Sequence, residues 1–157
     1  MTAKLSKTSY TYTGKEIKPA VTVEGLKKAD YTVSYKNNKN AGKATVTITG
    51  KGSYKGTIKK TFKITKAANP ITVSAKSPVT ASSKKKITVK KAVKVKKAQG
   101  KVTYKTSNKK VTVKKGAITI AKGLKKKTYK VKITITAKGN NNYKSQKVVK
   151  TIKIKVK

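Results

Sequence analysis

The chain has 157 residues, and its 43 basic residues are all lysine against only Glu16, Glu24 and Asp30, which gives a formal net charge of +40. It contains no Cys, His or Trp, so disulfides, thiolate nucleophiles and Cys-based zinc sites are excluded. Acid–base catalysis near neutral pH usually requires His or paired carboxylates, and a calcium site requires several carboxylate ligands. We therefore expect no enzyme, no metal site and no cofactor.

Charge is distributed unevenly along the chain. Residues 1–66 hold 15 lysines and all three acids, whereas residues 67–157 hold 28 lysines and no acid. A globule of this mass exposes on the order of 7,700 Å², which predicts about 13 Å between neighbouring lysines. The Debye length is about 8 Å at physiological salt and about 30 Å at 0.01 M. The chain can therefore fold despite this charge, because repulsion is largely screened in ordinary buffer, and repulsion becomes a collective penalty on the folded state at low salt.

The first half reads as short strands separated by turns. β-Branched and aromatic residues alternate with polar ones, which is typical of half-buried strands. Residues 37–42 read N-N-K-N-A-G, and a turn is expected there because Asn and Gly tolerate positive φ. The predicted strands are 5–12, 20–23, 30–35 and the two arms of 44–64.

The second half follows Asn69-Pro70, a dipeptide that disfavours helix, so we place a domain boundary there, with domains at 1–66 and 67–157. The same alternation continues, and the lysine runs fall between β-branched residues rather than on a 3.6-residue period. Further strands are predicted at 71–75, 87–89, 92–95, 102–106, 111–113, 117–120 and the two arms of 131–156.

One hairpin is written twice. Residues 46–64 read V-T-I-T-G-K-G-S-Y-K-G-T-I-K-K-T-F-K-I, and residues 133–154 read I-T-I-T-A-K-G-N-N-N-Y-K-S-Q-K-V-V-K-T-I-K-I. Two closing hairpins indicate two similar modules. The fold class predicted is all-β, with two tandem Ig-like β-sandwich domains. Tyr54 and Tyr143 occupy the corner in each copy, and we interpret them as packed tyrosines that brace the hairpin.

Lysine runs provide the candidate binding residues. Lysines blunt strand edges and keep β-proteins from aggregating, so a solvated surface is one interpretation. Polyanion binding is the other, because neutralising several phosphates releases counterions. Sequence-specific readout of bases is disfavoured because Arg is absent. The candidate residues are Lys84, Lys85, Lys86, Lys90, Lys91, Lys94, Lys96, Lys97, Lys109, Lys110, Lys114, Lys115, Lys125, Lys126 and Lys127.

Three stretches carry a family resemblance: Y-T-G-K-E-I-K-P-A-V-T-V (12–23), D-Y-T-V-S-Y-K-N-N-K-N-A-G (30–42) and the hairpin that follows. They resemble the bacterial Ig-like repeats of secreted and surface proteins of Gram-positive gut bacteria. The second half, with A-N-P-I-T-V, A-Q-G-K-V-T-Y and G-N-N-N-Y-K, resembles the Lys-rich module that often follows those repeats. The resemblance implies β-sandwiches, an extracellular location and no catalysis. An internal Lys–Asn isopeptide bond, found in some bacterial surface modules, is conceivable only in the first domain, where the acids lie.

These features lead to two functional hypotheses. The favoured one is a non-enzymatic extracellular structural or adhesive module, part of a larger exported protein, that binds teichoic acid, acidic glycans, mucin or, non-specifically, nucleic acid. The alternative is a dedicated supercharged carrier of nucleic acid or a heparin-like glycan, natural or engineered.

No stretch approaches the roughly 18 apolar residues of a membrane span, and M-T-A-K-L-S-K at the start lacks the apolar core of a signal peptide. We expect a mature fragment that is monomeric.

The charge predicts the direction of the salt effect on stability. Raising sodium chloride from about 0.01 M to 0.15 M shortens the Debye length from about 30 Å to about 8 Å, so the melting temperature of the chain should rise. Circular dichroism at each salt concentration measures it and should show a β-sheet spectrum throughout. A melting temperature that falls as salt is added would contradict the prediction.

Overall fold

The computed structural model describes residues 2–157, which are built of β-strands and one short 3₁₀ turn. The chain divides into two compact units. Unit 1 comprises the residues up to Ala67 together with Asn141–Tyr143, and unit 2 comprises Ala68–Asn140 and Lys144–Lys157. Each unit has its own hydrophobic core.

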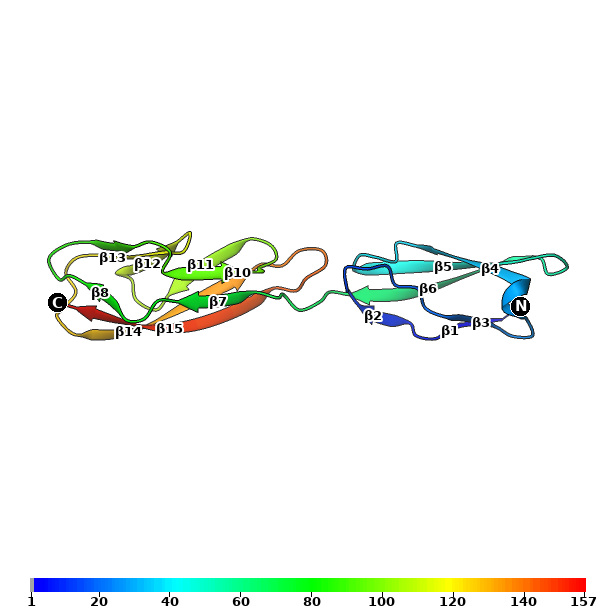
Figure 1. Cartoon of the computed structure of the whole chain (residues 1–157), viewed down its shortest axis with the longest axis horizontal. Coiled ribbons are helices and arrows are strands. Elements are labelled where there is room, and N and C mark those ends of the chain that lie inside the picture. The colour runs from blue at the N-terminus through cyan, green and yellow to red at the C-terminus, as the bar shows by residue number, and fades with distance from the viewer. Residues whose placement is uncertain (1) are drawn as a thin grey trace. The chain divides into compact units, whose positions relative to one another are not determined.

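Unit 1 is a sandwich of a four-stranded and a two-stranded sheet (Figure 1). The larger sheet has the order β2-β6-β5-β4, and the smaller one pairs β1 with β3. Its elements are β1 (Ala3–Leu5), β2 (Ser9–Thr11), β3 (Val21–Val23), η1 (Lys28–Asp30), β4 (Tyr31–Lys36), β5 (Gly42–Gly50) and β6 (Thr57–Thr65). The strand predicted at 5–12 is two strands, because β1 pairs with β3 in one sheet and β2 pairs with β6 in the other.

Alternation along β5 and β6 places one row of side chains in the core of unit 1. Val46 and Ile48 of β5 are fully buried, and Ile64 of β6 is only 1% exposed. The intervening Thr and Lys side chains face outward, as the two-residue period of a strand requires. Tyr31 and Tyr35 of β4 pack on the same core, and their hydroxyl groups donate hydrogen bonds to the carbonyl oxygens of Val21 and Pro19, respectively.

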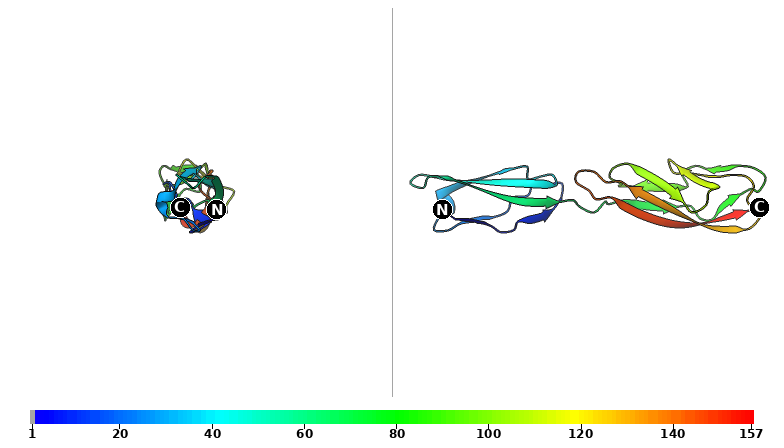
Figure 2. Two further views of the ribbon diagram at one scale, coloured as in Figure 1. Left: turned by 90° about the vertical axis from the view of Figure 1, so that its right-hand side faces the viewer. Right: turned by 180° about the vertical axis from the view of Figure 1, so that it is seen from behind.

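Unit 2 is a larger sandwich in which one layer is the four-stranded sheet β11-β14-β15-β8. The other layer is made of the sheets β12-β13-β9 and β10-β7. Figure 2 shows from behind that the long strands β14 and β15 run side by side. The elements are β7 (Thr72–Ala75), β8 (Val79–Ala81), β9 (Ile87–Val89), β10 (Val93–Lys96), β11 (Val102–Thr106), β12 (Val111–Lys114), β13 (Ala117–Ile120), β14 (Thr128–Ala137) and β15 (Gln146–Val156).

The sequence repeat is also a repeat of topology. In each unit the last two strands form the long antiparallel hairpin, β5–β6 in unit 1 and β14–β15 in unit 2. In each unit an earlier short strand then pairs in parallel with the last strand, β2 with β6 and β8 with β15. The predicted all-β fold with two tandem sandwiches is confirmed.

Asn69 in the predicted boundary is a structural residue of unit 2. It is only 7% exposed. Its side-chain amide donates to the carbonyl oxygens of Gln99 (2.8 Å) and Lys144 (3.2 Å), and its side-chain oxygen accepts from the Gln99 amide (2.9 Å). A buried amide with this many partners is satisfied, so Asn69 holds together two loops far apart in the sequence.

Two expectations are wrong. Tyr54 is not a packed brace, since its side chain is 45% exposed. Its backbone, not its ring, packs at the corner of the hairpin, where a Cβ on Gly50 would collide with the Tyr54 carbonyl. The solvent-accessible surface is 10,666 Å² rather than about 7,700 Å², because two small units expose more surface than one globule. The mean spacing of the 43 lysines is therefore about 16 Å.

Candidate functional site

All fifteen candidate lysines are exposed, and the structure places them in three parts of unit 2. We name the largest group the end-loop cluster: Lys84, Lys85, Lys86, Lys109, Lys110, Lys125, Lys126 and Lys127, with Lys122 added by the structure. The turn cluster consists of Lys90, Lys91, Lys94, Lys114 and Lys115. Lys96 and Lys97 lie at the end of β10, two and three residues beyond Lys94. The fifteen residues therefore do not form one site.

Strand register creates the end-loop cluster. In the sheet β12-β13-β9, Ile120 at the end of β13 pairs with Ile87 at the start of β9 and with Val111 at the start of β12. The loops 82–86, 107–110 and 121–127 therefore meet at the same end of the unit, close to the C-terminus in Figure 1. The sequence runs had not indicated that these loops converge.

Hydrogen bonds tie the loops of the end-loop cluster to one another. The amide of Gly123 donates to the carbonyl of Ser83 (2.9 Å), and the amide of Ala121 donates to the carbonyl of Lys110 (2.8 Å). The Lys110 ammonium donates to the Gly123 carbonyl (3.0 Å). The loops thus present their remaining ammonium groups from a braced backbone, and a braced site loses less conformational entropy on binding.

A tyrosine anchors the run 125–127. The Tyr129 hydroxyl donates to the carbonyl of Lys125 (3.2 Å), and the Lys127 ammonium lies 5.0 Å from the centre of the Tyr129 ring. A cation at this distance is attracted by the ring face. Tyr129 packs against the core of unit 2, so it connects the cationic loop to the rigid sheet.

The turn cluster lies at the opposite end of the same three strands. Lys114 pairs with Ala117 across a two-residue turn formed by Lys115 and Gly116. Both turn residues have positive φ, 48° for Lys115 and 79° for Gly116, as a type I′ hairpin turn requires. Such turns favour Asn-Gly, yet the first position is lysine. Lys91 (φ 51°) and Lys97 (φ 56°) repeat the pattern as second members of lysine pairs.

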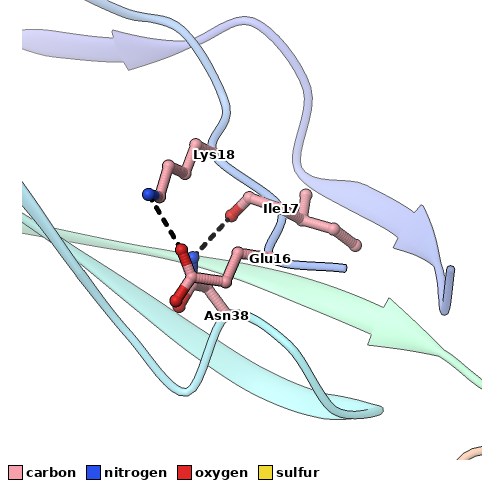
Figure 3. A network of polar contacts seen from close by, with 4 residues as sticks. All are labelled: Glu16, Ile17, Lys18 and Asn38. Carbon is pink, nitrogen blue, oxygen red and sulfur yellow. Dashed lines mark hydrogen bonds and ion pairs between the residues drawn. The ribbon is translucent and has the colours of Figure 1, made fainter. Parts of the chain in front are cut away.

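In unit 1, Glu16 forms an exposed ion pair with Lys18 (Figure 3). The ammonium of Lys18 lies 2.8 Å from the carboxylate of Glu16, and the hydrogen bond between them lowers the pKa of the Glu16 carboxyl and raises the pKa of Lys18. The amide nitrogen of Asn38 donates to the Ile17 carbonyl (3.1 Å). Lys18 therefore pairs with Glu16 rather than Asn38, and this constellation does not support an isopeptide bond.

The sequence runs missed a set of lysines on strands. Lys105, Lys130, Lys132, Lys153 and Lys155 lie on the outer face of the sheet β11-β14-β15-β8 and are exposed. Each alternates with a buried or half-buried residue, so none belongs to a run. The signal available in the sequence was the alternation itself, which requires outward lysines wherever inward Val and Ile define a strand.

Groups of three or more potential metal ligands of the His, Cys, Asp and Glu type do not occur within residues 2–157. Over the same range, no helix has the length and apolar character required to cross a bilayer.

Comparisons with known proteins give similarity of structure only. Neither a family model nor a curated protein sequence matches the chain. The structure of Sidekick-1 immunoglobulin domains 1-4 matches with a TM-score of 0.51 at 8% identity, over 99% of this chain and 48% of that one. Drosophila N-cadherin EC1-4 (TM-score 0.44, 14% identity, 100% and 50% covered) and the tandem Ig repeats of Dlar (0.34, 12%, 99% and 97%) also match.

The Sidekick-1 match supports the fold, two Ig-like sandwiches in tandem, and this chain spans about half of that structure. At 8% identity the likeness carries no information on ligand or activity.

The left-handed lysines yield a prediction about stability. Lys115→Asn places the preferred residue in the type I′ turn and should stabilise unit 2 by up to about 1 kcal/mol. Lys114→Asn removes the same charge from a strand position, where Asn is disfavoured on a scale that spans about 1 kcal/mol, and should destabilise. Urea unfolding followed by the NMR signals of unit 2 measures both variants. Equal effects would show that charge removal, not turn geometry, controls the result.

Proposed function

We propose that the chain is a non-enzymatic, extracellular structural or adhesive module of a larger exported protein, bacterial in origin, whose lysine-covered surface binds anionic polymers. The observation that carries this proposal is the surface of unit 2. It has no acidic side chain to neutralise its lysines, and its loops bring nine exposed lysines together in the end-loop cluster.

Electrostatics favour an anionic polymer over a small anion. The ammonium groups that the three loops present can contact many charges of one polymer at once, and each contact releases a condensed counterion. A small anion gains only one or two such contacts, and water screens each of them strongly. Affinity for a polymer therefore grows with its length until the cluster is covered.

The Ig-like fold supports the structural part of the proposal. Sandwiches of this kind carry their variable loops at the two ends, and the end-loop cluster occupies such a position in unit 2. The fold match includes Sidekick-1 immunoglobulin domains. An extracellular setting also suits a lysine surface, because acidic glycans and polyol-phosphate polymers are abundant there.

A salt-resolved titration tests the proposed function. Heparin, duplex DNA and neutral dextran are each titrated with the chain between about 0.05 M and 0.2 M sodium chloride. We expect binding to both polyanions that persists at 0.15 M, a loss of about 10³- to 10⁵-fold over the range if 6–10 charges are contacted, and no binding to dextran. Absence of polyanion binding at 0.15 M would overturn the proposal and leave a spacer.

A charge-matched pair of variants localises the binding. One variant carries Lys→Gln at the six end-loop residues Lys84, Lys85, Lys86, Lys125, Lys126 and Lys127. The control carries Lys→Gln at six exposed lysines of unit 1: Lys4, Lys7, Lys15, Lys28, Lys51 and Lys55. The end-loop variant should bind heparin more weakly than the control. Equal losses would assign binding to net charge alone.

A further inference from the structure

The outer face of the sheet β11-β14-β15-β8 carries five lysines in a diagonal line. Lys155 and Lys153 lie two residues apart on β15, Lys153 pairs directly with Lys130 of β14, and Lys132 follows two residues along β14. Lys105 of β11 pairs with Thr134, the next outward position after Lys132. We name this line the lysine staircase: Lys155, Lys153, Lys130, Lys132 and Lys105.

Strand geometry fixes the spacing of the staircase. Two residues along a strand span about 6.8 Å, and neighbouring strands lie about 4.8 Å apart. The five Cα positions therefore cover about 22 Å along the diagonal, in steps of about 5 to 8 Å. A phosphodiester repeat with six backbone bonds is twice as long as a peptide residue, or about 7 Å when extended. One phosphate per lysine is thus a geometric match.

A second observation is that the central pair of the staircase brings two like charges opposite each other. Lys130 and Lys153 are direct cross-strand partners, and like charges in this position are destabilising. Their Cα atoms lie about 5 Å apart, which is within the Debye length of about 8 Å, so salt does not screen the repulsion fully.

Unit 1 repeats this unfavourable pair. Lys43 of β5 and Lys63 of β6 are direct partners, and they occupy the positions in the repeated hairpin that correspond to Lys130 and Lys153. The next outward pair, Thr45 with Thr61, shows that threonine is accommodated beside them. A hollow of about 430 Å³ adjoins the pair and is lined by Lys43, Lys63, Thr8, Thr61, Gly42 and Phe62. Because this unfavourable pair occurs in both units, we infer that a bound anion neutralises it.

The chemistry of the face selects among phosphodiester polymers. Apart from lysines, the outward residues of β14 and β15 are threonines and Val149, and the tyrosines of β11 and β14 pack toward the core. Single-strand nucleic-acid platforms rely on aromatic side chains on which bases stack, and this face offers none. Hydroxyl donors such as Thr134 and Thr151 suit phosphate and polyol oxygens.

We propose that the lysine staircase binds one extended phosphodiester chain without bases, of the polyol-phosphate type, with about one phosphate per lysine. This inference rests on the proposed binding of anionic polymers and names the polymer class and the surface. It is a surface separate from the end-loop cluster, because its lysines project from strands rather than loops.

A crossed design tests the staircase. One variant carries Lys→Thr at Lys105, Lys130, Lys132, Lys153 and Lys155; the charge-matched control carries Lys→Thr at Lys84, Lys85, Lys86, Lys126 and Lys127. The probes are an oligomer of propane-1,3-diol phosphate, oligo(dT) of equal charge, and heparin. Circular dichroism and melting curves confirm that each variant is folded.

For the propanediol-phosphate oligomer, the staircase variant should lose five contacts, so its slope of log K against log salt should fall by about 3.5, at about 0.7 per contact. The loop control should retain most of the slope, and the wild-type chain should bind oligo(dT) no more tightly than the base-free oligomer. Equal losses in both variants would overturn the staircase while leaving polyanion binding intact. Tighter binding of oligo(dT) would overturn the base-free assignment, and a wild-type chain that binds no polyanion would overturn the proposed function itself.

Discussion

The two-residue period of the long hairpins is the constraint on which the rest of the structure depends. In β14, Val131, Ile133 and Ile135 are at most 1% exposed, and the residues between them face solvent. In β5 the same alternation buries Ala44, Val46 and Ile48. The apolar row drives the sheets together, and it leaves only the alternate positions for polar residues. Because those positions carry Lys and Thr, the alternation that builds the sheets also makes their outer faces cationic.

The wide average spacing of the lysines explains why a charge of +40 is compatible with a folded chain. The mean spacing of about 16 Å between lysines is twice the Debye length of about 8 Å at physiological salt. Repulsion is therefore local rather than global, and it concentrates where lysines come closer, as in Lys130–Lys153 and Lys43–Lys63. At these pairs, the proposed binding of an anion would relieve the most repulsion, and it would link the stability of the chain to binding.

Structural features that depend on neighbours in the chain could be predicted from the sequence, whereas features that depend on strand pairing could not. The strands at 102–106 and 117–120 were predicted with the observed bounds, because alternation is a local signal. The strand β8 was missed, since three residues give no period and its place is set by parallel pairing with β15. Among the site residues, the lysine runs are visible in the sequence, but the convergence of the end loops follows from strand register, and the staircase requires three strands to be aligned.

Two valines of the β14–β15 hairpin test directly whether the two-residue period of the strands holds unit 2 together. Val131 faces the core and is 1% exposed, whereas Val149 faces outward and is 55% exposed. The measurement is the free energy of unfolding of unit 2 in urea, followed by its NMR signals, for Val131→Ala and Val149→Ala. We expect the free energy of unfolding to fall by about 2 kcal/mol for Val131→Ala, because two buried methyl groups are lost and a cavity is left. For Val149→Ala we expect a change within about 0.5 kcal/mol. Equal losses in the two variants would contradict the dependence of the fold on the inward row of side chains.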